Sequence, residues 1–208
     1  MSKGKLEDNI QSLSVGEHIR MRPNMYFQKC YDEKSLDSLV SEVLCHALDE
    51  YFAGVCNEIN ITVAKKSFTI RYNSGMSLKL NSGLELTDAE IIMTKIMACS
   101  NLKKHLEVGK EFCVLGLATI NFASQSSSLV TVSKNLKGNF SFVDGETVSA
   151  DIEEYKNEAE WTEITMEPNR TIFEGLYFTY QGVKEKITPL RERFKDLKIN
   201  VIDETIAE

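Results

Sequence analysis

Several features that mark secreted, membrane-spanning or metal-binding proteins are missing from this sequence. No apolar run reaches the length of a membrane-spanning helix, and the first residues lack the apolar core of a signal peptide. The five cysteines include no CxxC pair and no paired histidine spacing of a zinc site. An odd number of cysteines without a secretory signal favours reduced thiols. We therefore expect a cytoplasmic protein without a bound metal.

Positive charge is also scarce. The chain carries 24 Lys and Arg against 31 Asp and Glu, which gives a formal charge of −7. Because affinity for nucleic-acid phosphates needs clustered Lys and Arg, this balance argues against direct nucleic-acid binding, and nothing suggests a membrane partner. With 208 residues, 42% of them hydrophobic and 26% charged, the chain has the size and composition of one globular domain.

The clearest pattern present is an amphipathic helix over 35–54, SLDSLVSEVLCHALDEYFAG. Its apolar residues recur at the i, i+3, i+4, i+7 spacing of one helical face. Ser35 is placed to cap the start of this helix, and Gly54 is placed to end it. The opposite face groups three polar residues, which on an ordinary helix would be a solvated surface: Glu42, His46 and Asp49.

The motifs around this helix resemble a known family. The turn IRMRPNMYF precedes the helix, which reads EVLCHALDEYFAG, and alternating segments at 59–63 and 68–72 predict a β-hairpin. In order, spacing and length they resemble the N-terminal ATPase domain of DNA gyrase B and topoisomerase IV B subunits. That family has V/I-R-x-R-P-G-M-Y-I-G and E-I/V-V-D-N-S-I-D-E-A-x-A-G. The glycine of the family's turn is Asn24 here, a residue type that tolerates a left-handed backbone.

Further elements continue this resemblance to the end of the chain. We expect a loop at 74–86, a capping box from Thr87 to Glu90 that opens a helix, and the family's flexible lid over 99–112. A helix over 114–124 resembles G-V-G-x-S-V-V-N-A-L-S. The remaining expected elements are strands at 129–134, 138–143, 147–151 and 162–166, with a turn at Asp144-Gly145, a helix at 183–197 kinked or divided by Pro189, and a strand at 197–204.

The resemblance implies a GHKL (Bergerat) fold. This fold is a two-layer α/β sandwich in which helices cover one face of a mixed, largely antiparallel sheet. We expect a loose segment over 1–13 and a single GHKL-like domain over 14–204. The transducer, toprim and DNA-cleavage domains of the family are expected to be absent.

Two helix residues carry much of what the resemblance implies about chemistry. The family glutamate at the position of Glu42 is the general base that activates water for ATP hydrolysis. Four residues later the family has an asparagine that holds Mg²⁺, whereas this chain has His46. Imidazole is a poor ligand for Mg²⁺, which prefers oxygen. We therefore favour an ordinary polar-face histidine over a metal ligand or an imidazolium that contacts phosphate.

The family's adenine-binding motif is altered in this chain. Where the family reads R-D-N-G-R-G-I-P, the chain reads RYNSGMSL, so the aspartate that accepts the adenine amino group becomes Tyr72. A register one residue later would place Asn73 there, with an amide oxygen able to accept instead. The alternation of strand side chains favours Tyr72. We expect its buried ring to close part of the purine slot and its hydroxyl to bond to His46 or Asp49.

The remaining site positions differ from the family to varying degrees. The phosphate grip G-G-L-H-G-V-G becomes EFCVLG, in which only Gly116 remains and large side chains obstruct a close backbone approach. The arginine of the adenine motif is missing, which leaves Glu50 without its expected ion-pair partner. By position, the resemblance also places Met76, Thr162 and Asp49 near the nucleotide.

These substitutions lead to two main hypotheses about function. The first is a divergent gyrase-B-type ATP-binding domain with nucleotide binding weak or lost and hydrolysis impaired. ATP and Mg²⁺ would be its cofactors only if the family activity survives. The second is a non-catalytic interaction module that pairs with or modulates a type II topoisomerase subunit. An active ATPase ranks last, because three altered motifs and the transducer's lysine would need compensation.

Overall fold

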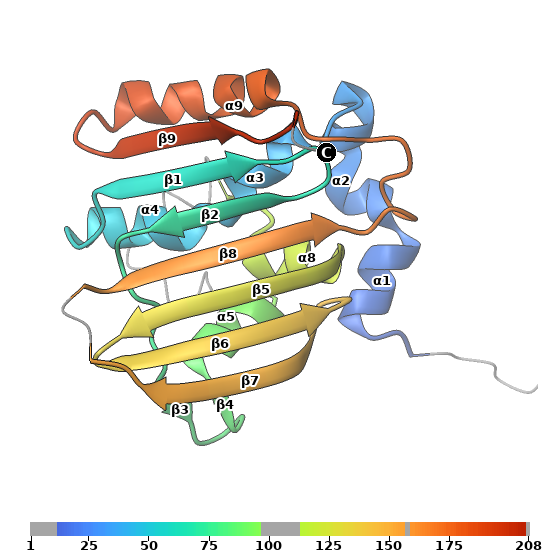
Figure 1. Ribbon diagram of the computed structural model, residues 1–208. Helices are drawn as coiled ribbons and strands as arrows, with labels where there is room; N and C mark the ends of the chain where they lie inside the picture. Colours follow the sequence, from blue (N-terminus) through green and yellow to red (C-terminus); the bar gives the residue numbers. More distant parts are fainter. Residues whose placement is uncertain (1–11, 97–112, 157–158, 207–208) are drawn as a thin grey trace, which may run out of the picture.

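A seven-stranded sheet forms the centre of the structure, a computed structural model that describes residues 12–96, 113–156 and 159–206. The strand order across the sheet is β7-β6-β5-β8-β2-β1-β9 (Figure 1). All neighbouring strands are antiparallel except β1 and β9, which are parallel. The strands are β1 (Glu58–Val63), β2 (Phe68–Tyr72), β5 (Ser124–Ser133), β6 (Leu136–Val143), β7 (Glu146–Glu154), β8 (Trp161–Pro168) and β9 (Lys198–Asp203).

Helices cover one face of this sheet, and the last helix runs beside the edge strand β9 (Figure 1). A separate two-stranded sheet, β3 (Leu80–Asn81) with β4 (Leu86–Thr87), lies within the stretch that we expected to be a loop. The helices are α1 (Val15–Met21), α2 (Pro23–Glu33), α3 (Asp37–Val43), α4 (Cys45–Phe52), α5 (Asp88–Thr94), α8 (Leu117–Phe122) and α9 (Tyr180–Arg193).

The hydrophobic core lies between the sheet and its helices. Alternate residues of β1, Ile59 and Ile61 among them, are fully buried, as the period of a strand requires. Val40, Val43 and Ala47 of the helix layer belong to the same buried cluster. The two-layer sandwich and the largely antiparallel mixed sheet that the sequence predicts are therefore confirmed.

The long helix that we expected over 35–53 is divided in two. At Leu44 the backbone N–H bonds to the carbonyl of Ser41, three residues back, at 3.3 Å, which is a tighter turn than that of an α-helix. The thiol of Cys113 also donates to that carbonyl, at 3.4 Å. Ser35 precedes the first piece and accepts the N–H of Asp37, although Leu36 is the capping residue. Gly54 ends the second piece with φ of +77°, as predicted.

The N-terminal region contains two helices, of which α2 was not expected from the sequence. Ser14 and Glu17 form a capping box that begins α1, and Pro23 occupies the first turn of α2. The sequence analysis predicts a turn around Pro23, but α2 begins there and continues to Glu33. Asn24 accordingly lies in a helix and is not left-handed, because a proline at the first helical position favours a helix there.

The sequence patterns typical of helix caps and hairpin turns predicted the local structure correctly. Thr87 and Glu90 form the predicted capping box, in which each side chain bonds to the other residue's backbone N–H. Asp144 and Gly145 join β6 to β7 with φ of +51° and +84°, the left-handed values that such a hairpin turn requires. These expectations depended only on local chemistry, and the structure confirms them.

The C-terminal helix is anchored by a buried aspartate. Asp37 accepts hydrogen bonds from the backbone N–H of Thr179 at 2.7 Å and from its hydroxyl at 2.8 Å, just before α9 begins. The helix then continues through Pro189 without being divided, contrary to one of our expectations. Buried residues before and after the proline, Ile187 and Leu190, hold both halves of α9 on the core.

Some predictions concern residues outside the described part of the chain. They are the loose segment up to residue 11 and the lid over 99–112. In the part that the structure describes, none of the helices combines the length and apolar character needed to cross a membrane.

Candidate functional site

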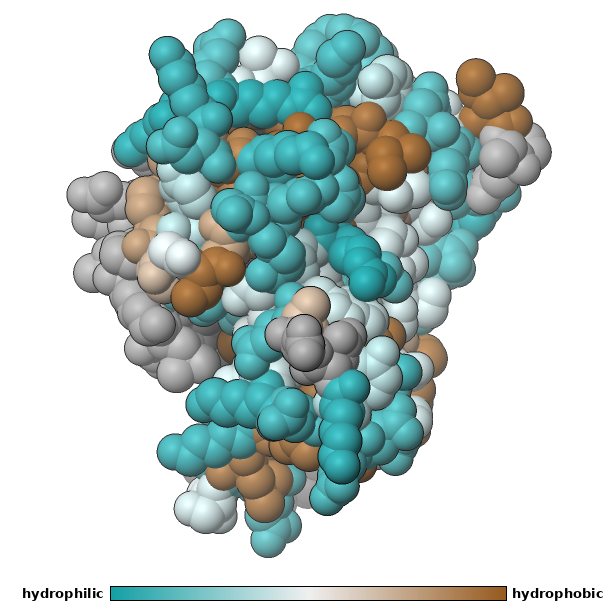
Figure 2. Space-filling model, turned by 60° about the vertical axis from the view of Figure 1, so that its left-hand side comes forward, coloured by the Kyte–Doolittle hydropathy of each residue, from teal (hydrophilic) through white to brown (hydrophobic). Residues whose placement is uncertain are grey.

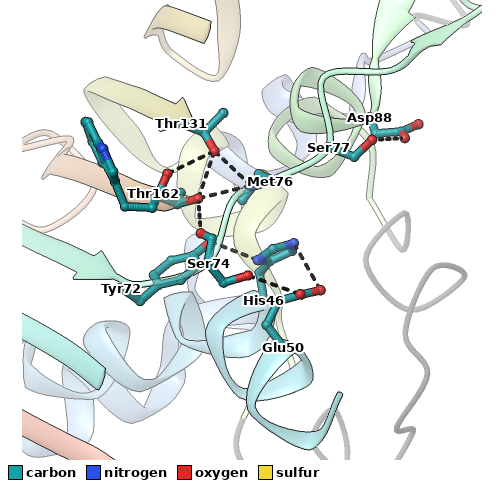
Figure 3. Close-up of polar contacts among 10 residues, drawn as sticks. His46, Glu50, Tyr72, Ser74, Met76, Ser77, Asp88, Thr131 and Thr162 are labelled. Carbon is teal, nitrogen blue, oxygen red and sulfur yellow. Dashed lines mark hydrogen bonds and ion pairs between the residues drawn. The ribbon is translucent and has the colours of Figure 1, made fainter. Parts of the chain in front are cut away.

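Tyr72 is the centre of the candidate site. It is the last residue of β2, its side chain is buried, and its hydroxyl shares a hydrogen bond of 2.9 Å with Nδ1 of His46 on α4 (Figure 3). Of the two partners that the sequence suggested for this phenol, His46 is confirmed. Burial raises the pKa of the phenol well above its usual range, so Tyr72 stays neutral and keeps this bond.

His46 links Tyr72 to a second set of polar groups. Its Nε2 atom lies 3.9 Å from a carboxylate oxygen of Glu50, one helical turn further along α4. The other carboxylate oxygen of Glu50 accepts a hydrogen bond of 3.1 Å from the hydroxyl of Ser74. The family's arginine, the expected ion-pair partner of Glu50, is missing, and Ser74 and His46 are partners of Glu50 instead.

The loop after β2 lies directly on the sheet. Thr162 of β8 donates to the carbonyl of Ser74 at 2.8 Å, and the N–H of Met76 donates to the hydroxyls of Thr131 at 2.8 Å and Thr162 at 3.1 Å (Figure 3). A side chain at Gly75 would overlap the backbone oxygen of Val132. The loop thus reaches its position because residue 75 is glycine and two threonine hydroxyls bind its backbone.

Strand register explains why these residues meet. Tyr72 on β2 is opposite Thr162 on β8, which is in turn opposite Thr131 on β5. The three side chains therefore form a row across the middle of the sheet, beneath α4 and the loop. A row of this kind depends on the pairing of distant strands, so Thr131 gave no signal that sequence analysis could use.

A cavity of about 360 Å³ opens beside this row. Ser77 in its wall bonds to Asp88 at 2.7 Å, which connects the loop to the start of α5 (Figure 3). The charged and titratable residues that line the cavity are Asp49, Glu50, Asp88 and Glu160, with His46 and Lys134. Four carboxyl groups against one lysine make this an unfavourable place for a polyanion. In the described residues, no cluster of three or more His, Cys, Asp or Glu is arranged to hold a metal ion.

Glu42 occupies a different surface. One of its carboxylate oxygens accepts the backbone N–H of Leu115 at 2.8 Å, just before α8, and the residue lines a larger groove of about 540 Å³. Glu42 thus faces the segment before α8. Gly116 follows as the capping residue of α8 with φ of +76°. The Glu42 carboxylate therefore uses one of the backbone N–H groups that precede this helix.

Asn73 points away from the candidate site. Its side-chain oxygen accepts the backbone N–H groups of Asn57 and Glu58, each at 3.0 Å, at the start of β1. The alternative register, in which Asn73 would replace the family's aspartate, does not agree with this placement. The structure therefore brings His46, Tyr72, Met76 and Thr162 together, places Asp49 on the neighbouring cavity, and leaves Glu42 and Gly116 at the segment before α8.

Comparison with known proteins identifies relatives among type II topoisomerase subunits. The chain is 26% identical over 205 residues to the DNA gyrase B protein of Rickettsia typhi and 28% identical over 205 residues to the DNA topoisomerase 4 B protein of Staphylococcus aureus. These alignments cover 97% and 95% of this chain but 25% and 30% of the relatives. The chain thus spans less than a third of their length. No protein-family model matches it.

Solved structures show the same fold. The topoisomerase IV ATP-binding domain of Francisella tularensis, in complex with a small-molecule inhibitor, superposes with a TM-score of 0.71 and 22% identity. That match covers 93% of this chain and 92% of the other. The 43K ATPase domain of Thermus thermophilus gyrase B, in complex with an aminocoumarin, gives a TM-score of 0.73 at 21% identity and covers 92% of this chain and 49% of the other.

Proposed function

The chain is a divergent relative of the ATPase domains of the gyrase B and topoisomerase IV B proteins, and from this relation we propose that it keeps their fold while its own side chains close the purine site. Nucleotide binding is then weak or lost, and ATP hydrolysis is impaired. The observation that carries this proposal is the hydrogen bond between the buried Tyr72 and the half-buried His46, at the position where the resemblance places adenine.

The adenine position supports the proposal through volume and hydrogen bonding. The resemblance implies a carboxylate at residue 72 that accepts from the adenine amino group, whereas a tyrosine ring fills that space. Thr162 also matches a family residue near the adenine, but here its hydroxyl bonds to the loop backbone at Ser74 and Met76. A purine would have to displace the ring and compete for these bonds. Buried polar groups that lose their partners cost about 1–3 kcal/mol each.

The charges and side-chain types at the expected phosphate and metal positions also support the proposal. Mg²⁺ prefers oxygen ligands, and the family's asparagine is replaced by His46, whose Nδ1 already bonds to Tyr72. Four carboxyl groups line the neighbouring cavity, where a polyanion would be repelled. The residues present do not fit ATP with Mg²⁺, so we derive no hydrolytic step for this chain.

A direct test compares nucleotide binding and turnover in matched variants. We expect ATP or ADP, with or without Mg²⁺, to leave the wild-type melting temperature unchanged, since a ligand stabilises only a protein that it binds. We expect ATP turnover at background in the wild type and in Glu42→Ala alike. A gyrase B ATPase domain serves as the positive control. Turnover at ordinary enzyme rates that disappears in Glu42→Ala would contradict the proposal.

One observation favours a second candidate function, that of a non-catalytic interaction module. The strand at one edge of the sheet, β7, is exposed along almost its whole length. Edge strands of this kind can pair with another chain. A partner of the topoisomerase type, which the relatives suggest, belongs to this second candidate.

A further inference from the structure

The two edges of the central sheet differ sharply in exposure. At one edge, α9 runs alongside β9, and the guanidinium of Arg191 donates to the backbone carbonyl of Ile199 at 3.0 Å (Figure 1). At the other edge lies β7, in which every residue from Glu146 to Glu154 is exposed except the half-buried Thr147. A strand pairs through only one side when it lies at the edge of a sheet, so the outer backbone groups of β7 are available to a new strand.

The outer strand carries charge of a single sign. Its sequence, ETVSADIEE, contains four carboxyl groups and no basic residue. One of them, Glu153, lies 3.7 Å from Lys137 on the neighbouring strand β6. The carboxyl groups gather toward the end of the strand, where Asp151, Glu153 and Glu154 stand within four residues of each other. A segment that paired here would meet a row of negative charge.

Exposed apolar side chains accompany this charge. Ala150 pairs with the buried Phe140 of β6, so Ala150 and Ile152 face the helix side of the sheet, where 42% of Ile152 is exposed. Leu80 and Leu84, from the β3–β4 region, are 62% and 51% exposed. Both regions lie at the lower end of the molecule in Figure 1, and Figure 2 shows apolar side chains among hydrophilic ones at that end.

The regular part of β7 defines the length of the available edge. Pairing with β6 is shifted between Ser141 and Phe142, where Val148 is the extra residue of a bulge. From Ser149 to Glu154 the register is continuous. Because a bulge disrupts pairing locally, an added strand would pair along Ser149–Glu154.

We propose that the Ser149–Glu154 edge binds an extended, basic segment of another protein, which adds an eighth strand to the sheet. Backbone hydrogen bonds would hold the segment, lysine or arginine side chains would face Asp151 and Glu153, and apolar side chains would cover Ile152. The inference names a partner class for the second candidate function. It does not depend on whether the purine site is closed.

Charge excludes a second copy of this chain as the occupant. Pairing of two β7 strands along Ser149–Glu154 would place six carboxyl groups along one ladder, three from each copy, with Lys137 near Glu153 and with Lys134 and Lys156 near Glu154 in each copy. Like charges opposite each other across strands are destabilising. Opposite charges favour association and orient the partner, which makes a basic segment the complementary occupant.

The test uses a capped six-residue peptide of alternating lysine and valine, titrated into the whole isotope-labelled chain at low salt. A matched control peptide has proline in place of two valines, so it keeps the charge but cannot form the ladder. We expect saturable chemical-shift changes centred on the backbone amides of 149–154 and slower hydrogen exchange there. The proline peptide should not produce them.

Two charge-reversal variants complete the experiment. Asp151→Lys/Glu153→Lys should weaken peptide binding about tenfold or more, because two attractive pairs become repulsive. Glu192→Lys/Asp196→Lys, which makes the same change of net charge beside the other sheet edge, should leave it unchanged. Equal binding of both peptides, binding of neither, shifts away from β7, or wild-type dimers that pair through β7 would each overturn the proposal. Nucleotide binding is scored separately, so failure of one proposal leaves the other intact.

Discussion

Tyr72 lies at the centre of the candidate site and is buried there. Its ring is part of the core, and its hydroxyl has a partner within the protein, His46, at 2.9 Å. A buried aromatic side chain contributes mainly through its apolar area, with the hydrogen bond a smaller addition. The side chain of Tyr72 therefore contributes both a buried apolar ring and a hydrogen-bonding hydroxyl to the structure.

The two contributions of Tyr72 can be separated by mutation. Tyr72→Phe should lower the free energy of unfolding by about 1 kcal/mol through loss of the bond to His46. Tyr72→Ala should lower it by about 3–5 kcal/mol through the cavity that it leaves. Urea unfolding measures both, with the exposed Tyr177 changed to Phe as the control. A loss below about 1 kcal/mol for Tyr72→Ala would be inconsistent with a ring packed in the core.

Replacing Asp37 should lower the free energy of unfolding, because its carboxylate anchors the start of α9. Asp37→Asn weakens the acceptor for both the N–H and the hydroxyl of Thr179, so we expect a loss of about 1–3 kcal/mol in unfolding free energy. Asp32→Asn changes an exposed carboxylate that accepts a hydrogen bond from Gln28 and should cost less than about 0.5 kcal/mol. Similar losses in the two variants would show that Asp37 does not anchor α9.

Residue-level prediction from the sequence succeeded where strand alternation or helical spacing decided the outcome. The buried position of Tyr72 and its bond to His46 followed from the faces of one strand and one helix. The contact of Glu50 with Ser74 was not predicted, because Ser74 reaches it from a loop whose path depends on Thr131 and Thr162. Side chains that meet only after distant strands pair leave no local pattern.

The hairpin between β6 and β7 leaves no room for a side chain at Gly145. Gly145 has φ of +84°, and a side chain there would overlap the ring of Phe122 and approach its Cα atom to 2.7 Å. Gly145→Ala should therefore cost more than the 1–2 kcal/mol of a left-handed backbone alone. Gly54→Ala is the matched control, because its φ is +77° but no atom lies within 4 Å of the added carbon. Equal losses of unfolding free energy in the two variants would show that Phe122 moves aside freely.

Most elements of the fold were predictable, and the exceptions have physical reasons. Alternation and turn residues located the strands, and capping residues located α5. The helix α2 was missed because Pro23 was interpreted as a turn, although proline is also favoured in the first turn of a helix. The break at Leu44 was missed because it involves Cys113, a residue distant in the chain, at the carbonyl of Ser41.

At the scale of the whole molecule, the fold matches that of the relatives, whereas the residues of the candidate site differ from those that the resemblance implies. The sheet order and helix layer are those of a GHKL ATPase domain, with TM-scores of 0.71 and 0.73 to two solved examples. Our proposal places Tyr72 and His46 where the resemblance implies adenine and Mg²⁺, and these two residues bond to each other. Core packing can be kept while ligand-binding residues change, since the two depend on different side chains.

Isothermal titration calorimetry with ATP and Mg²⁺ tests the central claim most directly. We titrate the wild-type chain, with a gyrase B ATPase domain as the positive control, under the same conditions. If the purine site is closed, as we propose, this chain should give no saturable heat of binding at ATP concentrations up to about 1 mM. A dissociation constant of about 1 mM corresponds to a binding free energy of only about 4 kcal/mol. Binding of one ATP per chain with a micromolar dissociation constant, dependent on Mg²⁺ and lost in Glu42→Ala, would contradict it.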